Sequence, residues 1–530
     1  MSEKKTRSRR TFPLSIVEKY YPRAWDCRLP FLHPSLTATR PKLIKAGIVN
    51  TIIIQLLFFA LFCYLFGALY QQGPRTHNLD VLWVDYDGGL IGQAVNAAYA
   101  RLRSDQFPTL VARPVSQYPS SDALREAVCG ADYWAAVYTV AGSSARLGLA
   151  IAGLNTSRYN ESDVLFYIWN EAKYPAVTDS ALSSNMVALS GAARIAYVAL
   201  NGTGALSTVP PGNSAAVSVF ANPWTITSVN LKATTQGTRA VYNTIAIVLI
   251  LLQNFFFLAT INGLYVQFKI YNRAPPRFII LIRALIACVY TFLGGLLITV
   301  AIWAFKAGWD VSGAAFVLDW ATFWLLSHVS FLVLDVFSIW IPPQYVPFAL
   351  VTWVVTNVTS VIVPFSLSSG FYRWGYALPA HAAYEVLTDI WSGGCNPHLY
   401  FALPVLFAYE VLGNLGTSLG VYKRCHLAVV AEEATKHASM LLEQTRERRQ
   451  SRARAPSAAN GEALIAGGSG RVAGTRTEDA EESEREQREE LDEEDEQAVE
   501  DIQRLETQAT RIYSNLGPAF QLVGSDERQG

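Results

Sequence analysis

Residues 46–70 read AGIVNTIIIQLLFFALFCYLFGALY and contain no charged side chain. A helix of about 20 apolar residues crosses the hydrocarbon core of a bilayer, so this stretch predicts a membrane-spanning helix. It begins behind a basic arm of 45 residues, whereas a cleaved signal peptide is shorter and starts near the terminus. We therefore interpret it as an uncleaved anchor.

Five more apolar runs follow after a gap of about 170 residues. Backbone polar groups in lipid have to bond to one another, so each run is expected to be a helix. The predicted fold class is an α-helical integral membrane protein with six transmembrane helices, the bundle of the last five occupying residues 241–422. The five runs are 241–265, 278–305, 315–341, 345–367 and 399–422.

Charge is concentrated at the two ends of the chain. Charged residues make up 16% of the sequence, against roughly 25% in an ordinary soluble protein. Residues 1–45 and 423–530 hold 52 of the 86 charges, while the 207 residues of 46–70 and 241–422 hold only 12. This distribution excludes a soluble enzyme, a secreted disulfide scaffold and a globally basic protein that binds nucleic acid.

The basic residues next to the spans predict the orientation. The arm 1–45 has 11 Lys and Arg against three acids, the loop 266–277 has three basic residues, and Lys423 and Arg424 follow the sixth span. Cytoplasmic loops are enriched in Lys and Arg, so both termini are expected in the cytoplasm. Residues 71–240 then lie outside.

The exterior segment 71–240 has ordinary charge, with 11 basic and 11 acidic residues. We expect a folded α/β domain of mixed strands and helices, inserted between the first and second spans. The predicted strands are 79–84, 133–140 and 164–170, the predicted helices are 90–103 and 180–200, and 201–223 is predicted to be a loop.

Two kinds of modification are compatible with an exterior location. Asn155, Asn160 and Asn201 each begin a glycosylation sequon. Cys129 and Cys395 are the only two cysteines expected outside, and an oxidising compartment permits a disulfide between them.

The tail 423–530 is predicted to be a disordered, charged cytoplasmic segment. A basic cluster at residues 446–454 precedes residues 478–501, which hold 15 acids and two arginines, and such segments bury too little apolar surface to fold. The basic cluster either touches anionic lipid or is a solvated linker. Residues 500–513 are a candidate short helix or coiled coil.

No catalytic, cofactor or metal site is predicted. The sequence has no Gly-Lys pair and so no phosphate-binding loop of the GxxxxGK[ST] type, which argues against an intrinsic ATPase. Asp85 and Asp87 follow a strand, where turns favour Asp and Gly. His381 and Glu385 share a helix face without a third ligand, so we expect a structural or interfacial role rather than a metal site or an enzyme.

Residues 416–420 match the GxSxG pattern of hydrolases but fall in the sixth span. Gly413, Gly416 and Gly420 lie on one helix face, and small residues at this spacing allow close helix packing. We expect packing rather than catalysis.

Ionisable residues inside the apolar runs are the better functional lead, because such residues usually face the bundle interior or a cavity. His328 and Glu410 are expected to lie deep, and with Asp319 they are the candidates for a polar path in the membrane or a pair across helices. Arg283 is expected to extend its head group to the interface, and Asp335 to lie near it.

Two sequence blocks carry a family resemblance, VDYDGGLIGQA at residues 84–94 and FYRWGYALP at residues 371–379. Together with the layout of one span, a large exterior domain and five spans, they resemble the fungal nitrosoguanidine-resistance membrane proteins over roughly residues 40–425. That family is similar to phage-infection-type membrane proteins and, more distantly, to the membrane subunits of type-2 ABC exporters. The resemblance implies a plasma-membrane protein, or one of another secretory-pathway membrane, and it supplies no catalytic residues.

The resemblance implies a role in resistance to toxic compounds, in phospholipid arrangement, or in both. The expected partners are membrane lipids, and one expected oligomeric state is a homodimer. The alternative is a permease subunit of an ABC-type exporter that works with a separate ATPase. A short cytoplasmic helix at residues 14–21 would support that alternative. A receptor or scaffold is compatible with the same layout.

Overall fold

The computed structural model describes residues 33–34, 37–154, 156–234, 239–306, 311–454 and 478–514. The predicted helix at 14–21 and nearly all of the basic arm lie outside these residues. The chain divides into two compact units, residues 1–63 and 64–530. Most of helix α2 (Thr39–Leu69) belongs to the first unit; the helix carries the apolar run of residues 46–70, and large side chains such as Phe59 are exposed.

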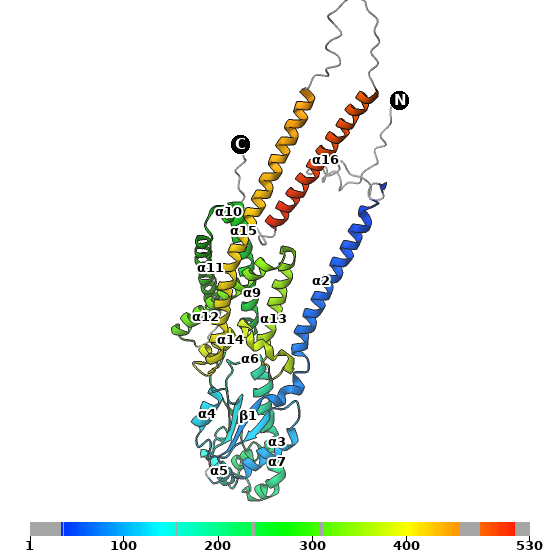
Figure 1. Cartoon of the computed structure of the whole chain (residues 1–530). Helices are drawn as coiled ribbons and strands as arrows, with labels where there is room; N and C mark the ends of the chain where they lie inside the picture. Colours follow the sequence, from blue (N-terminus) through cyan, green and yellow to red (C-terminus); the bar gives the residue numbers. More distant parts are fainter. Residues whose placement is uncertain are drawn as a thin grey trace, which may run out of the picture. The chain divides into compact units, whose positions relative to one another are not determined.

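The predicted α/β domain, in which Figure 1 labels β1, has a five-stranded mixed sheet in the order β2-β1-β3-β4-β5. β1 pairs in parallel with β2 and β3, β4 pairs in parallel with β5, and β3 and β4 are antiparallel. The strands are β1 (Asp80–Asp85), β2 (Thr109–Ala112), β3 (Ala135–Thr139), β4 (Leu165–Trp169) and β5 (Ile226–Asn230).

Alternating side chains of the strands build two cores, one on each face of the sheet. Val81, Trp83 and Val137 belong to the core that contains the helices α3 and α7, whereas Leu82 and Ala136 belong to the core under α4. The helices of this domain are α3 (Leu90–Leu102), α4 (Ser121–Cys129), α5 (Ser143–Ile151), α6 (Pro175–Val177), α7 (Ser184–Thr208) and α8 (Ser214–Ala221).

The segment 201–223, predicted to be a loop, is mostly helical, and this prediction is wrong. α7 continues to Thr208 and α8 begins at Ser214, where the side chain of Asn213 caps it. Ala205 and Ala216 are buried, so packing against the domain stabilises helices that the Gly- and Ser-rich sequence does not favour by itself.

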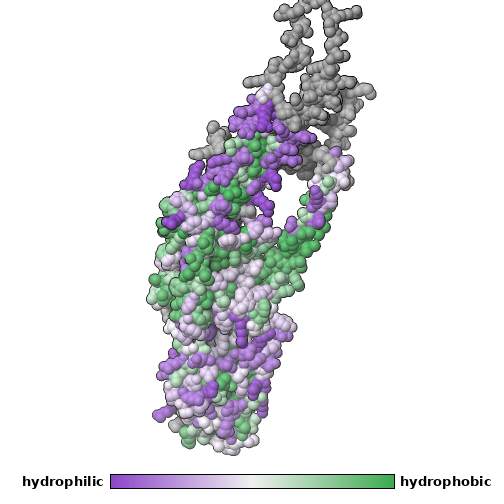
Figure 2. Space-filling view, in the orientation of Figure 1, coloured by the Kyte–Doolittle hydropathy of each residue, from purple (hydrophilic) through white to green (hydrophobic). Residues whose placement is uncertain are grey.

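In the part of the chain that the structure describes, six helices are long and apolar enough to cross a membrane. In Figure 2 the helical part of the chain shows extended apolar surface, and the α/β domain shows more hydrophilic side chains. After α2, the helices that contain these spans are α9 (Arg239–Gln267), α11 (Pro276–Ala304), α12 (Gly313–Trp340), α13 (Val346–Ile362) and α15 (Leu399–Arg454).

Short elements connect these helices. α10 (Ile270–Arg273) lies in the basic loop between α9 and α11, and the 3-10 helix η7 (Gly370–Ala377) and α14 (Pro379–Ser392) lie between α13 and α15. α14 is buried almost along its whole length, although it is too short to be a span. It packs against α12, α13 and α15 and so forms part of the bundle core.

Three glycines of α15 face α12, as the pattern at residues 413–420 predicted. An added Cβ at Gly413 would lie 2.7 Å from Leu332 Cβ, and one at Gly416 would lie 2.8 Å from Val336 Cγ2. An added Cβ at Gly420 would lie 2.1 Å from Ile339 Cδ1. The two helices therefore approach closely along the glycine face, and the serine of the GxSxG pattern lies within a helix rather than on a strand–helix turn.

The tail was expected to be disordered, but its described residues are helical. α15 continues to Arg454, and α16 (Glu478–Ser514) lies beside it (Figure 1). Arg448 and Arg449 lie 3.5 Å and 3.2 Å from Glu494 and Asp495. Opposite charges and the apolar contacts of residues such as Ile502 let the two helices order each other, which composition alone does not reveal.

Candidate functional site

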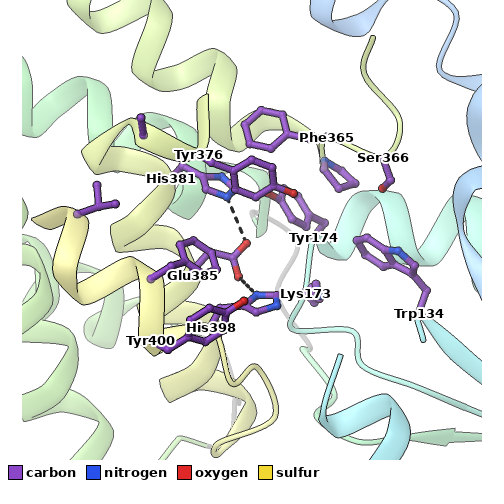
Figure 3. Close-up of a pocket in the computed structure, with 14 residues that line it drawn as sticks. Trp134, Lys173, Tyr174, Phe365, Ser366, Tyr376, His381, Glu385, His398 and Tyr400 are labelled. Carbon is purple, nitrogen blue, oxygen red and sulfur yellow. Dashed lines mark hydrogen bonds and ion pairs between the residues drawn. The ribbon is translucent and has the colours of Figure 1, made fainter. Parts of the chain in front are cut away.

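A cavity of about 660 Å³ lies where the α/β domain meets the bundle (Figure 3). Its walls come from the start of β3, the loop after β4, η7, α14 and the start of α15. The volume is within the range of roughly 300–1,000 Å³ that is typical of small-molecule sites. The lining side chains that carry charge or a ring include Trp134, Lys173, Tyr174, Phe365, Tyr376, His381, Glu385, His398, Tyr400 and Phe401.

Glu385 of α14 is the polar centre of the cavity. Its Oε2 lies 2.6 Å from Nδ1 of His398 and accepts a hydrogen bond of 2.7 Å from Asn396 Nδ2, and its Oε1 lies 3.5 Å from Nε2 of His381 (Figure 3). His381 is one turn earlier on the same helix, and its Nδ1 lies 2.9 Å from the carbonyl oxygen of Ser360. The carboxylate is thus held in one position by groups from α14 and from the segment before α15.

These contacts determine the charge of Glu385. Burial raises the pKa of the carboxyl, but the hydrogen bond from His398, the nearby charges of His381 and Lys173 and the hydrogen bond from Asn396 outweigh burial and lower the pKa to about 2. Burial lowers the pKa of His381, and Glu385 offsets part of that effect. Burial likewise lowers the pKa of Lys173. The cavity therefore contains an ionised carboxylate among groups whose charged forms are disfavoured.

The loop after β4 is a part of the α/β domain that lines the cavity and contacts the helical bundle. Asn170 Nδ2 donates to the carbonyl of Cys395 at 3.2 Å, and the backbone N–H of Tyr174 donates to the Tyr384 hydroxyl of α14 at 3.1 Å. The ammonium of Lys173 lies 4.8 Å from the centre of the Trp134 ring, a cation–π contact. The α/β domain and the helical bundle therefore both line the cavity.

Tyr174 has a left-handed backbone, with φ of 51° and ψ of 62°. This conformation is uncommon for a bulky residue and is found where the surroundings hold it in place. Here the ring packs edge-on against Tyr384, with centroids 4.9 Å apart, and lines the cavity. A strained residue held in this way indicates that the cavity is a defined feature of the fold rather than a packing defect.

A disulfide joins Cys129, the last residue of α4, to Cys395. Gly393 and Gly394 precede Cys395 with φ of 70° and 94°, which glycine adopts at no steric cost. This turn also leads directly to Asn396 and His398. The bond therefore attaches the α/β domain covalently to the segment that holds Glu385.

The other predicted site residues lie elsewhere. Asp85 and Asp87 complete the turn between β1 and α3: Asp85 Oδ1 accepts from Thr139 at 2.6 Å, and Asp87 Oδ1 accepts from the backbone of Ser144 at 2.9 Å. An added Cβ at Gly92 would lie 1.8 Å from Asp85 Oδ2, so the helix start fits closely over this turn. Among the described residues no three His, Cys, Asp or Glu side chains are grouped to hold a metal ion.

His328 and Glu410 meet across α12 and α15. Nδ1 of His328 lies 2.8 Å from Oε1 of Glu410, which also accepts from Asn414 Nδ2 at 2.9 Å. Asp319 is buried elsewhere on α12, close to Trp391 of α14. Within the described part of the chain no hydrogen bond links Asp319 to the other two, so the three do not form one continuous path.

The sequons differ in accessibility. Asn160 is exposed, and its Oδ1 accepts from the backbone of Ser162 at 3.1 Å. Asn201 lies inside α7 and is half-buried against Tyr197. Asn155 lies outside the described residues. Glycosylation at Asn160 is therefore sterically the most favourable of the described pair.

Sequence reasoning found two residues of the cavity and missed the rest. His381 and Glu385 were noticed because they are four residues apart on a helix. Lys173 and His398 lie in separate loops with no local pattern, and only the folded chain brings them to the same carboxylate. The Gly-Gly-Cys sequence before His398 was the one signal of a sharp, tethered turn.

These features define a class of protein: a chain with six membrane-span-like helices, an α/β domain between α2 and α9 in the sequence, and a cavity between the domain and the bundle. A family model described as a protein of unknown function (DUF3533) matches residues 50–415, so the chain belongs to this family. The match includes the sheet and every residue of the cavity. No solved structure matches the chain.

Proposed function

We propose that this chain is a multi-pass plasma-membrane protein of the nitrosoguanidine-resistance type that binds amphipathic compounds in the cavity around Glu385. Its contribution to the cell is resistance to toxic compounds, phospholipid arrangement, or both. The protein is not an enzyme and has no ATPase of its own. Both termini are cytoplasmic and the α/β domain is exterior.

The cavity is the observation that carries this proposal. Its apolar walls suit an acyl chain or an aromatic ring, and its ionised carboxylate suits a cationic group. Tyr174, Tyr376 and Trp134 add ring faces, which attract cations, including the quaternary ammonium of choline. Because the cavity adjoins the apolar helices, a compound can move between it and the outer half of a bilayer.

The proposal is tested by the growth of cells in which the gene for this protein has been deleted and replaced by a gene for one of its variants. Ala377 is exposed and lines the cavity, so Ala377→Phe fills space without disturbing the core. Ala188→Phe makes the same change on an exposed position of α7, away from the cavity. We expect Ala377→Phe, at normal abundance, to lose resistance to a nitrosoguanidine-type compound and to alter surface labelling of phospholipid, while Ala188→Phe behaves as wild type. Equal growth and labelling of both variants would contradict the proposal.

A permease subunit of an ABC-type exporter is the second candidate. The observation in its favour is α10 in the basic loop, where Asn272 Nδ2 donates to the carbonyl of Ala428 at 2.9 Å and to Glu432 of α15 at 2.8 Å. A helix fixed in this way offers a rigid contact for a cytoplasmic ATPase. Mass spectrometry of the native complex in mild detergent tests it: a stoichiometric ATPase supports the permease, and an intact complex without one rejects it.

A further inference from the structure

Asp335 of α12 lies between two arginines from other helices. Arg283 of α11 donates to Asp335 through Nε at 3.1 Å and through Nη2 at 2.7 Å, and Arg424 of α15 donates through Nη1 at 3.0 Å. Arg283 Nη2 also donates to Asn262 Oδ1 of α9 at 2.8 Å, and Arg424 Nη2 donates to the Ser338 hydroxyl at 2.7 Å. Arg283, expected to extend its head group to the interface, is instead buried with its head group on Asp335, and the position of Asp335 near the interface stays a prediction.

The cluster has a surplus positive charge. The side chains of Arg283, Asp335 and Arg424 are 4%, 1% and 2% exposed. Guanidinium groups stay protonated in proteins, and Asp335 is the only acidic side chain that pairs with either arginine in the described part of the chain. Two cations with one anion leave a net charge of +1 away from water, which is unfavourable unless another anion compensates it.

The same cluster has donors without acceptors. Arg283 Nη1, Arg424 Nε and Asn262 Nδ2 are all buried, and none has a hydrogen-bond partner among the described residues. Each of these atoms can only donate. Buried donors in native proteins are nearly always satisfied, so the missing group has to be an acceptor.

Space for such a group adjoins the cluster. A cavity of about 50 Å³ is lined by Arg283 and Asp335, and by the polar side chains of Asn414, Thr417 and Ser418. One water needs roughly 10–15 Å³, so this cavity accommodates a small ion but not a bulky organic acid.

We propose that this cluster is a binding site for one small monoanion of halide size. The anion neutralises the surplus charge and accepts from Arg283, which lines the cavity and has an unpaired donor. Since Asn262, Arg283, Asp335 and Arg424 belong to four different helices, neutralising their charge stabilises the contacts among α9, α11, α12 and α15. The phosphodiester of a lipid headgroup carries the same single charge but is larger than a cavity of about 50 Å³ accommodates, so it serves as the comparison anion.

Thermal unfolding of the full-length protein in detergent tests the site. At constant ionic strength, we expect Tm to rise saturably by roughly 3 °C or more when chloride or bromide replaces gluconate. In a second arm, phosphatidylglycerol is added to the gluconate sample. A rise with the lipid, with no further rise on adding chloride, would show that a lipid phosphate occupies the site and would overturn the assignment to a small anion. An equal Tm in chloride, bromide, gluconate and phosphatidylglycerol would overturn the proposal.

Substitution of Asn262 separates an anion site from a general salt effect. Asn262→Asp is nearly isosteric and places a built-in carboxylate beside Arg283, so the variant should unfold at the same Tm in chloride and gluconate. Arg283→Gln also leaves one arginine per carboxylate and should lose the response as well, at lower stability. Asn254→Asp is the control: it puts the same charge on α9, where Asn254 contacts Ser327 rather than an arginine, and it should keep the chloride response. A full chloride response in both Asn262→Asp and Arg283→Gln would also overturn the proposal.

Discussion

Glu385 is a buried carboxylate that stays ionised because donors from two segments face it. Its partners His398 and Asn396 follow the tethered turn at Cys395, and His381 comes from its own helix. The carboxylate thus depends on a segment that the α/β domain holds in place. A small shift of that segment would leave a buried charge without partners, which is costly.

The lowered pKa of Glu385 predicts an acid-sensitive stability. The ordinary pKa is 4.5 and the folded value is about 2, so the stabilisation is complete above pH 4.5 and is lost as the pH falls toward 2. We expect the free energy of unfolding of the wild type to drop by about 2 kcal/mol more than that of Glu385→Gln between pH 5 and pH 3.

Thermal unfolding of both proteins across pH 3–7 measures this difference. The pKa of His381 is also lowered, so its contribution is present above pH 6.5 and declines below it. That part of the decline should be at least as large in Glu385→Gln, because Glu385 partly offsets the lowering of the His381 pKa. Parallel pH profiles of the two proteins below pH 5 would show that Glu385 does not have the surroundings described.

At the scale of elements, the glycine face of α15 sets how closely it approaches α12. Gly413 is the most demanding position, because its neighbour is the Cβ of Leu332, which cannot move without the backbone. We expect Gly413→Val to destabilise the protein by about 1–3 kcal/mol through overpacking. Gly47→Val on α2 is the control, since no described atom lies within 4 Å of an added Cβ there. The yield and Tm of the two variants measure the effect, and an equal loss in both would mean that the helices do not pack along this face.

The disulfide between α4 and the segment before α15 predicts a second effect at this scale. It closes a separation of 266 residues, and loss of such a bond costs about 2–5 kcal/mol. We expect Cys129→Ser and Cys395→Ser to lower Tm equally and to abolish the response of Tm to a reducing agent. Cys63→Ser, which alters a free cysteine, should keep that response. A reductant response that persists in Cys129→Ser would contradict the pairing.

At the scale of the whole molecule, hydropathy predicted more than local pattern did. The six apolar runs coincide with the six span-like helices because lipid-sized helices need long uncharged stretches. The strands at 79–84, 133–140 and 164–170 were found as buried runs, whereas β2 and β5 were missed because four or five half-buried residues have no clear period. Of α16, only the part at residues 500–513 was predicted, and the rest was missed because its order comes from pairing with α15.

The cavity could not be predicted because its residues are close only in space. Lys173 and Glu385 are far apart in the sequence and belong to different parts of the fold, and each looks like an ordinary polar residue by itself. The net charge of the Arg283 cluster was hidden for the same reason, since Asn262, Arg283, Asp335 and Arg424 come from four helices. Sequence patterns reveal elements, whereas sites made between elements require the folded chain.

Photo-crosslinking from η7 tests the central claim, that the cavity binds an amphipathic compound. Tyr376 and Phe371 are both exposed aromatic residues of η7, and only Tyr376 lines the cavity. A photoreactive phenylalanine analogue at each position, activated in intact cell membranes, is followed by mass spectrometry of the adducts. The account predicts a defined lipid or toxic compound attached at position 376, reduced by Ala377→Phe, and little at position 371. Equal labelling of both positions, or no adduct at 376, would contradict it.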